Sequence, residues 1–178
     1  MNRYKEELSE LKDFGFDHQT TVLLDSLVSL DNYHQHITAK HALESKGDEI
    51  LPVMHALTDS RSALIRKEAA KIIKYIGDLT SIPVAIKLLD DKDGDIRWIA
   101  AEALIYIGRA CIRPLLKALL DNQHAFFMRE GAHHVFSELI RVRDPKELLE
   151  LQQLLLNGEY QEQIPVKIRQ ILNRDYFL

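Results

Sequence analysis

Histidine is the residue type in this sequence that most invites a chemical role, and eight histidines occur among its 178 residues. The strongest candidates for metal ligands are His34, His36 and His41, together with the adjacent pair His133 and His134. Ligands that share a metal on one helix favour a spacing of three or four residues, whereas adjacent side chains point about 100° apart. The pattern therefore favours histidines that face solvent or form hydrogen bonds, and we predict no metal site.

The single cysteine, Cys111, is the next candidate, as a nucleophile. It precedes an apolar segment that contains Pro114, and a helix start there would lower the pKa of the thiol slightly. No histidine stands in the same turn, and the residues at equivalent positions, Glu49 and Thr80, are ordinary for a helix start. The sequence also lacks a Gly-rich phosphate loop and a Gly-x-Ser-x-Gly motif. We therefore predict no catalytic residue and no cofactor, and we favour a protein that is not an enzyme.

The elements that position these residues form a repeat. Residues 66–77 read RKEAAKIIKYIG and residues 97–108 read RWIAAEALIYIG, and weaker copies stand at 36–47 (HITAKHALESKG) and 129–140 (REGAHHVFSELI). Successive copies are 30, 31 and 32 residues apart. One such unit cannot bury its apolar face alone, so the repeat predicts copies stacked on one another.

Glycine and proline mark the ends of each unit. The first three copies end in a glycine, which suits a left-handed helix cap: Gly47, Gly77 and Gly108. Five or six residues later a proline opens a second apolar stretch: Pro52, Pro83 and Pro114. Proline is tolerated in the first turn of a helix, because the N–H groups there have no intrahelical partner. Each unit is therefore expected to be a pair of helices.

The unit resembles the HEAT-repeat family, and in detail the short HEAT-like repeats of the phycobilisome-lyase type, whose pattern runs roughly (V/I)R-x-x-A-A-x-A-L-G-x-I-G. IRWIAAEALIYIG with IRPLLKALLD is the nearest match, and the resemblance covers about residues 19–140. It implies an all-α protein, a right-handed α-solenoid (alpha-alpha superhelix, armadillo-like) of HEAT-like helix pairs. The metal enzyme of this family, deoxyhypusine hydroxylase, uses His-Glu pairs in successive helices, and no His-Glu dipeptide occurs here.

We predict a single HEAT-like repeat domain over residues 1–178. Its parts are an N-terminal cap (1–17, with a helix over 2–13), four repeats (18–140) and a degenerate C-terminal repeat or cap (141–178). In HEAT-like stacks an aspartate in the turn and an arginine at the next helix start bond between neighbouring repeats. We therefore expect a structural role for Asp59, Asp90, Asp121, Arg66, Arg97 and Arg129.

The family resemblance also implies a surface. Ile65, Ala69, Ile72 and Ile76 have the spacing of a buried helical stripe, which leaves positions 67, 71 and 74 on the opposite face. Helices of this kind line the concave side of such solenoids, where the family usually binds. Equivalent positions form three rows: Ile37, Lys67, Trp98 and Glu130; His41, Lys71, Glu102 and His134; Glu44, Lys74, Ile105 and Ser137.

The third copy is apolar nearly all round, with Trp98 and Ile105 seven residues apart on the side expected to face solvent. Such a helix is usually covered by something else, and tryptophan is a frequent binding hot spot. One interpretation is therefore a partner-binding concave face; the other is a central helix buried on three sides, with Trp98 folded over a neighbour. The candidate partner-binding residues are Lys67, Lys71, Lys74, Trp98, Glu102, Ile105, Tyr106, Glu130 and His134.

These features favour a non-enzymatic scaffold or adaptor that binds another protein or a peptide. The resemblance leaves two alternatives: a bilin-lyase-like or chaperone-type protein acting on a tetrapyrrole or its carrier, and a nucleic-acid-binding or DNA-repair protein. The second is disfavoured, since a net charge of −4 lacks the basic excess that nucleic-acid binding needs. A homodimer through the same apolar patch is a further alternative.

Bulk composition suggests where such a protein resides. One cysteine allows no internal disulfide, which indicates a reducing compartment. The charged start MNRYKEELSE is unlike a signal peptide, and no apolar run approaches the ~18–20 residues that span a bilayer. We therefore expect a soluble, cytoplasmic protein with no membrane partner.

Overall fold

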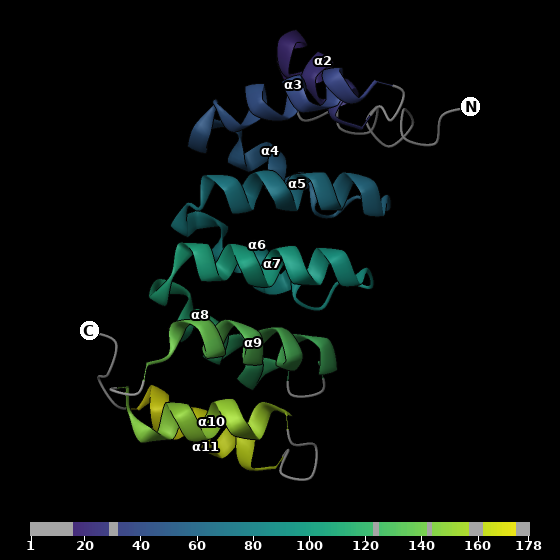
Figure 1. Cartoon of the computed structure of the whole chain (residues 1–178). Helices are drawn as coiled ribbons and strands as arrows, with labels where there is room; N and C mark the ends of the chain where they lie inside the picture. The colour runs from purple at the N-terminus through teal and green to yellow at the C-terminus, as the bar shows by residue number, and fades with distance from the viewer. Residues whose placement is uncertain (1–15, 29–31, 123–124, 142–143, 157–161, 174–178) are drawn as a thin grey trace. The chain divides into compact units, whose positions relative to one another are not determined.

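The computed structural model describes residues 16–28, 32–122, 125–141, 144–156 and 162–173, and these residues are almost entirely helical (Figure 1). No strand occurs within these ranges. This confirms the all-α class and the series of helix pairs. The chain forms two compact units, Met1–Ser81 and Ile82–Leu178. The predicted N-terminal helix at 2–13 lies outside the described residues.

The first unit holds the first two predicted helix pairs. Its helices are α2 (His18–Val28), α3 (Tyr33–Glu44), α4 (Leu51–Leu57) and α5 (Ala63–Ile76). Helix α3 packs against α2 and α5, and α4 packs against α5. The Asn32 side chain caps α3 by accepting hydrogen bonds from the backbone N–H groups of His34 and Gln35. Leu43, Met54 and Ile72 are fully buried where these helices meet.

The second unit holds the next two pairs and the C-terminal helices. Its helices are α6 (Ile82–Leu88), α7 (Gly94–Ile107), α8 (Ile112–Asp121), α9 (Phe126–Leu139), α10 (Lys146–Leu156) and α11 (Gln163–Leu172). Helix α7 packs against both α6 and α9. Ala100, Ala101 and Ala103 are buried in α7, and such small side chains let neighbouring helices approach closely.

The helix boundaries follow the predicted glycine and proline signals with one exception. Gly77 and Gly108 cap α5 and α7 with φ of 68° and 88°, values that favour glycine. Gly47 also has a positive φ of 61°, but it does not cap a helix. Helix α3 ends earlier, at Glu44, and a short 3-10 turn (Gly47–Ile50) begins at Gly47.

The buried stripe of α5 is wider than predicted. Ile65, Ala69 and Ile72 are buried as expected, whereas Ile76 is only half-buried. The stripe extends sideways to Ala70 and Ile73, and it also includes charged residues, described below. The widening follows from packing, because α5 is covered by α3 as well as by α4.

Arg66 and Arg97 fasten the turns that precede their own helices. Arg66 donates hydrogen bonds to the carbonyls of Ser60 and Arg61, at 2.9 and 3.2 Å, and Arg97 donates to the carbonyl of Asp91 at 2.8 Å. These bonds run to backbone oxygens of the same repeat, and the aspartate–arginine bonds between neighbouring repeats stay a prediction. Arg66 and Arg97 therefore have a structural role, because an arginine that donates to the carbonyls of a turn holds the start of the helix in place.

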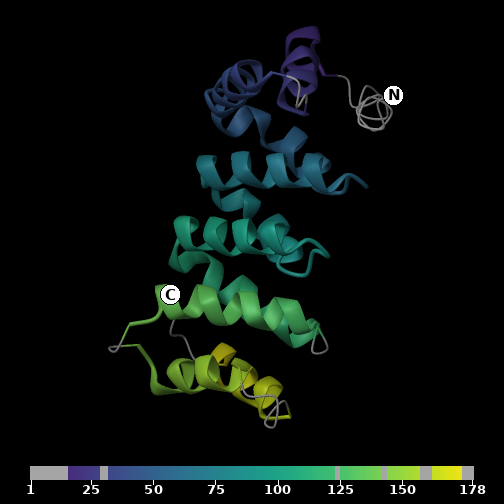
Figure 2. The same ribbon diagram turned by 45° about the vertical axis from the view of Figure 1, so that its right-hand side comes forward.

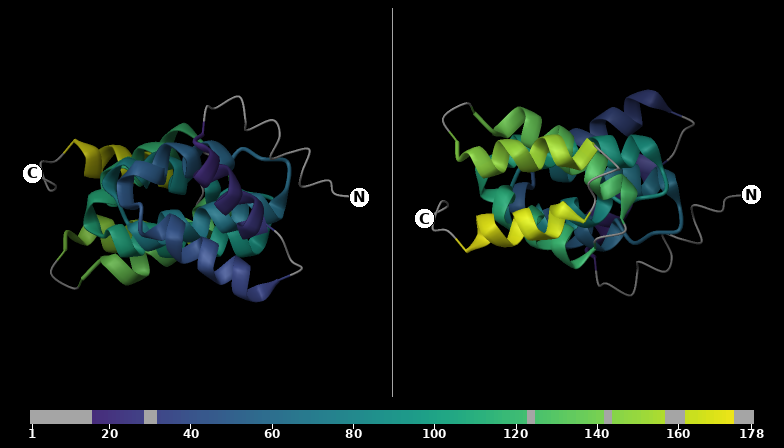
Figure 3. Two further views of the ribbon diagram at one scale, coloured as in Figure 1. Left: turned by 90° about the horizontal axis from the view of Figure 1, so that it is seen from above. Right: turned by 90° about the horizontal axis from the view of Figure 1, so that it is seen from below.

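The C-terminal pair inverts the order of the repeat. Helices α6 and α8 form one layer of this unit and α7 and α9 the other, and each earlier pair begins with the helix of the first layer. Helix α10 instead follows α9 directly and lies beside it, running in the opposite direction (Figures 1 and 2). Helix α11 then returns to pack against α8, in the other layer (Figure 3, right). The C-terminal segment is therefore a helix pair of reversed layer order.

Arg109 holds the connection that makes this reversal. Its guanidinium donates to the Leu139 carbonyl at 3.0 Å and forms two bonds to the Asp144 carboxylate, at 2.8 and 2.7 Å. Asp144 also accepts from the backbone N–H of Arg141. The hydrogen bonds from Arg109 hold the pKa of Asp144 below its ordinary value. A bidentate arginine–carboxylate pair of this kind holds the turn in one conformation.

No helix within the described ranges is both long and apolar enough to cross a membrane.

Candidate functional site

Trp98 is exposed and held in place by a neighbour. Its side chain lies near the start of α7 and is 58% exposed. The indole stacks on the imidazole of His134 from α9, with ring centroids 4.6 Å apart and an interplanar angle of 23°. Stacked aromatic pairs of this geometry contribute about 0.5–1.5 kcal/mol beyond the area that they bury. Trp98 is therefore a surface residue and not part of the core.

Glu102 orients the imidazole that supports Trp98. The Nε2 atom of His134 lies 3.1 Å from Oε1 of Glu102, and both side chains are about one-third exposed. Glu102 stands one helical turn after Trp98, so the two side chains share a face of α7. Glu102 and His134, which the sequence places in one row, are thus in direct contact. The geometry gives a fixed imidazole, held by a stack and by a hydrogen bond.

Glu130 completes a four-residue cluster, which we call the Trp98 face: Trp98, Glu102, Glu130 and His134. Glu130 precedes His134 by one turn of α9 and is exposed. It forms no ion pair with any residue that the structure describes. The Trp98 face therefore joins an aromatic surface to two carboxylates, one on each helix.

Two phenylalanines next to this face were not singled out by the sequence analysis. Phe126 and Phe127, the first residues of α9, are 56% and 39% exposed and meet edge to face at 5.6 Å. The guanidinium carbon of Arg97 lies 3.9 Å from the ring centroid of Phe127. The available signal was the FF dipeptide just before the fourth repeat arginine, Arg129. The prediction started the helix at that arginine, three residues too late, and so left both aromatics in a turn.

The remaining predicted binding residues differ in accessibility. Tyr106, near the end of α7, is 67% exposed, and Ile105 is half-buried. Lys67, Lys71 and Lys74 lie on α5 of the first unit and are half-buried. That the three lysines share one surface with Trp98 stays a prediction, because they belong to the first unit and Trp98 to the second.

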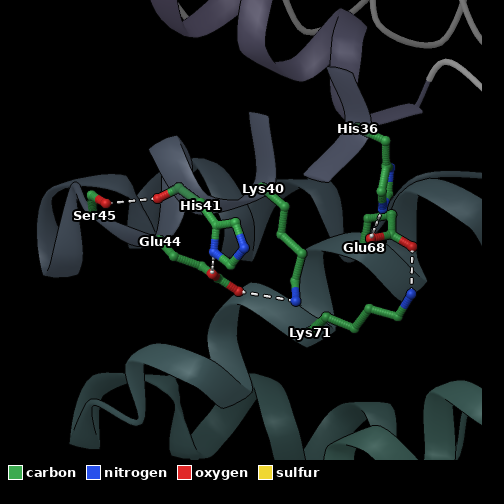
Figure 4. A network of polar contacts seen from close by, with 7 residues as sticks. All are labelled: His36, Lys40, His41, Glu44, Ser45, Glu68 and Lys71. Carbon is green, nitrogen blue, oxygen red and sulfur yellow. Dashed lines mark hydrogen bonds and ion pairs between the residues drawn. The ribbon is translucent and has the colours of Figure 1, made fainter. Parts of the chain in front are cut away.

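The first unit has a polar cluster of its own around two buried carboxylates (Figure 4). Glu68 of α5 lies 2.7 Å from Nζ of Lys71 and 3.7 Å from Nε2 of His36, a residue of α3. Glu44 of α3 lies 3.2 Å from Nζ of Lys40, and its other oxygen is 3.2 Å from His41. Each carboxylate has one fully buried oxygen that accepts no hydrogen bond from the described residues. Three of these contacts lie within a single helix, and the contact of His36 with Glu68 joins α3 to α5.

Four of the histidines that the structure describes form side-chain hydrogen bonds: His36, His41, His55 and His134. Nδ1 of His36 contacts the Leu27 carbonyl at 2.7 Å, and Nε2 of His55 contacts the Ser81 hydroxyl at 2.8 Å. Burial lowers the pKa of His55 and, together with the neighbouring charge of His134, that of His133. No group of three or more potential ligands within the described ranges is arranged to hold a metal ion.

Cys111 differs from the sequence expectation. The slight lowering of its pKa by a helix start is wrong, because the thiol is fully buried and burial raises its pKa to about 12. Its sulfur lies 3.5 Å from the Leu104 carbonyl and acts as a donor. A thiol in this environment stays protonated and is a poor nucleophile.

Comparison with known protein families identifies the type of repeat that these helices form. A model of HEAT repeats matches the chain twice, over residues 20–105 and 50–137, so that the two matches overlap and together cover all four predicted repeats except their outer ends. None of the curated proteins matches the chain.

Proposed function

The chain belongs to the HEAT-repeat family, and on that premise we propose that it is a non-enzymatic scaffold that binds another protein or a peptide through the Trp98 face. HEAT repeats commonly serve as protein-interaction scaffolds. The fold supplies a rigid framework of packed helices, and function in such folds depends on the side chains displayed on it.

One observation supports this proposal above the others: a large aromatic side chain is exposed and already fixed. Trp98 keeps more than half of its surface in solvent while His134 and Glu102 set its orientation. A partner that covers the indole would bury a large apolar area and lose little side-chain entropy on binding. Exposed aromatic side chains at Phe126 and Tyr106 extend the apolar area on the same two helices.

The chemistry of the second unit supports binding over catalysis. Cys111 is buried and protonated at neutral pH, so it is not poised to attack a substrate. No feature described above favours the bilin-lyase alternative. The carboxylates of Glu102 and Glu130 beside Trp98 would repel a phosphate backbone, which argues against nucleic acid as the ligand of this face.

The test is a selection of random short peptides, displayed on phage, against the full chain. Affinities of the selected peptides are then measured by calorimetry for the wild type, Trp98→Ala and Tyr75→Ala. Tyr75 is the matched control, since it is 61% exposed and holds in the second repeat the position that Tyr106 holds in the third. A hot spot is worth on the order of 2 kcal/mol or more, so Trp98→Ala should weaken binding roughly thirtyfold.

The proposal requires that Tyr75→Ala bind as the wild type does and that Trp98→Ala stay folded, losing little more than the stability of its stack on His134, about 0.5–1.5 kcal/mol. Peptides that bind Trp98→Ala and the wild type equally well would refute the assignment of the face. Sedimentation at several concentrations separates this proposal from the homodimer: self-association that Trp98→Ala abolishes would mean that a second copy covers the face.

A further inference from the structure

We infer that the segment bound at the Trp98 face presents an arginine side chain to it, with an apolar residue close by. This inference rests on the proposed function, because it names the chemistry of the partner that the face would take. It is drawn from the charges, the ring contacts and the helix register of α7 and α9.

The charges of α7 and α9 favour a cationic partner. The two helices contain four carboxylates (Asp95, Glu102, Glu130 and Glu138) and two guanidinium groups (Arg97 and Arg129). Both arginines are already engaged. Arg129 is buried, and Arg97 donates to the Asp91 carbonyl while it covers Phe127. Glu102 is also engaged, by His134, whereas Glu130 and Glu138 are exposed carboxylates, and they attract a partner of opposite sign to these helices.

The register of the helices places Glu102 and Glu130 one turn from the two rings of the Trp98–His134 stack. Glu102 lies one turn beyond Trp98 on α7, and Glu130 lies one turn before the stacked His134 on α9. One ring of the stacked pair is already bonded to Glu102, whereas Glu130 is exposed and forms no ion pair with the described residues. A cation placed over the exposed indole would therefore also find a carboxylate with capacity to accept hydrogen bonds.

A guanidinium fits this arrangement better than an ammonium. It is planar, so it can stack on an indole, and its paired N–H groups match the two oxygens of one carboxylate. The same surface already contains one such contact, since Arg97 lies over the ring of Phe127 at 3.9 Å. A partner arginine on Trp98 would repeat that contact on the neighbouring aromatic side chain.

Phe126 is the side chain that an apolar residue of the partner would contact. This ring is 56% exposed at the start of α9 and touches Phe127 edge to face. Glu130 follows it by one turn of α9, and the guanidinium carbon of Arg129 lies 5.8 Å from its ring centroid, so the exposed part of the ring offers an apolar contact beside the charged one. An acidic segment would meet like charges at Glu102 and Glu130, and a purely apolar segment would leave Glu130 desolvated without a partner.

The peptide selection described above tests the inference when its binders are sequenced. We expect arginine, followed or preceded by an aliphatic or aromatic residue, to be enriched among peptides that require Trp98. In the tightest binder, each arginine is then replaced by citrulline, which keeps the shape and removes the charge, and separately by lysine. Citrulline at the contact position should weaken binding at least tenfold, and lysine should weaken it severalfold.

The chain contributes its own probe and controls. Trp98 is the sole tryptophan, so its fluorescence reports occupancy of the face directly. Glu130→Gln should weaken the arginine peptide about fivefold, and this loss should disappear for the citrulline peptide. Glu49→Gln, at an exposed carboxylate of the first unit, should change neither affinity.

The outcomes separate the inference from the proposed function. Binders that depend on Trp98 but show no enrichment of arginine, or that tolerate citrulline, would overturn the inference and leave the scaffold function standing. A selection that yields no Trp98-dependent binder would overturn both. Self-association through Trp98 would also overturn the inference, because the occupant would then be a second copy of the chain.

Discussion

Removing Lys71 should destabilise the first unit far more than removing Glu68, although both substitutions break the same ion pair. The two charges are 2.7 Å apart, but the Glu68 side chain is only 3% exposed, whereas that of Lys71 is 39% exposed. Lys71→Met leaves a carboxylate buried without its closest cation. Glu68→Met leaves an ammonium group that can turn into water, and it removes the buried charge.

The magnitudes follow from the cost of burying a charge alone. Breaking a fully buried pair by removing one partner costs about 3–5 kcal/mol. Because Lys71 is half-exposed, water already screens part of the interaction, and we expect the loss for Lys71→Met to be about 2–3 kcal/mol. Replacing the buried carboxylate by methionine is expected to change stability by less than about 1 kcal/mol in either direction.

Urea unfolding at neutral pH measures both values. The double variant Glu68→Met/Lys71→Met should be nearly as stable as Glu68→Met alone, because the lone buried charge is gone. Lys146→Met is the control: this lysine, 86% exposed, pairs with Glu150 at 3.4 Å, and its loss should cost no more than about 0.5 kcal/mol. If Glu68→Met costs as much as Lys71→Met, or the double variant is not rescued, burial of the carboxylate is not what governs this pair.

Three further outcomes are expected. Burial lowers the pKa of His55, so the contribution of the neutral imidazole to stability is complete above the ordinary value of 6.5 and is lost as the pH falls through the lowered pKa. His55→Gln can still bond Ser81 but does not titrate, so its thermal midpoint should fall less on acidification than that of the wild type. Cys111, with a pKa of about 12, should react with iodoacetamide at neutral pH only after unfolding, as mass spectrometry will show. Gly131→Ala should cost about 1 kcal/mol in urea unfolding, because the approach of its Cβ to 2.7 Å from Cδ2 of buried Leu89 outweighs the higher helix propensity of alanine. In a Leu89→Val background, which removes that contact, the substitution should be neutral or stabilising.

Most of the fold was predictable because the repeat marks each helix pair several times over. Gly77, Gly108 and Pro52 stand where backbone geometry tolerates few other residues or tolerates proline at little cost, so the ends of the helices can be located from residue type. The Glu102–His134 contact was predictable for the same reason. A fixed offset between copies places equivalent side chains side by side on adjacent helices.

Features that depend on three-dimensional packing were not predictable. The reversed layer order of α10 and α11 follows from a turn fastened by Arg109 and Asp144, 35 residues apart, and no periodic signal announces such a bond. Glu68 is buried because α3 covers that side of α5, which a one-dimensional stripe cannot indicate. The stack of Trp98 on His134 joins neighbouring rows diagonally, since an indole is long enough to reach across a helical turn.

One position of the repeat shows how a shared fold allows a local site. Glu68, Ile99 and Gly131 are equivalent in successive copies, yet one is a buried charge, one a half-buried aliphatic residue and one an absent side chain filled by Leu89. The backbone tolerates all three because each is compensated by its own neighbours. The next position in the same three copies is alanine each time. Ala69, Ala100 and Ala132 are fully buried, because two helices approach too closely there for a larger side chain. Positions free of that constraint, such as the one occupied by Trp98, can diverge without cost to the fold, and for this reason the proposed recognition of a partner is placed there.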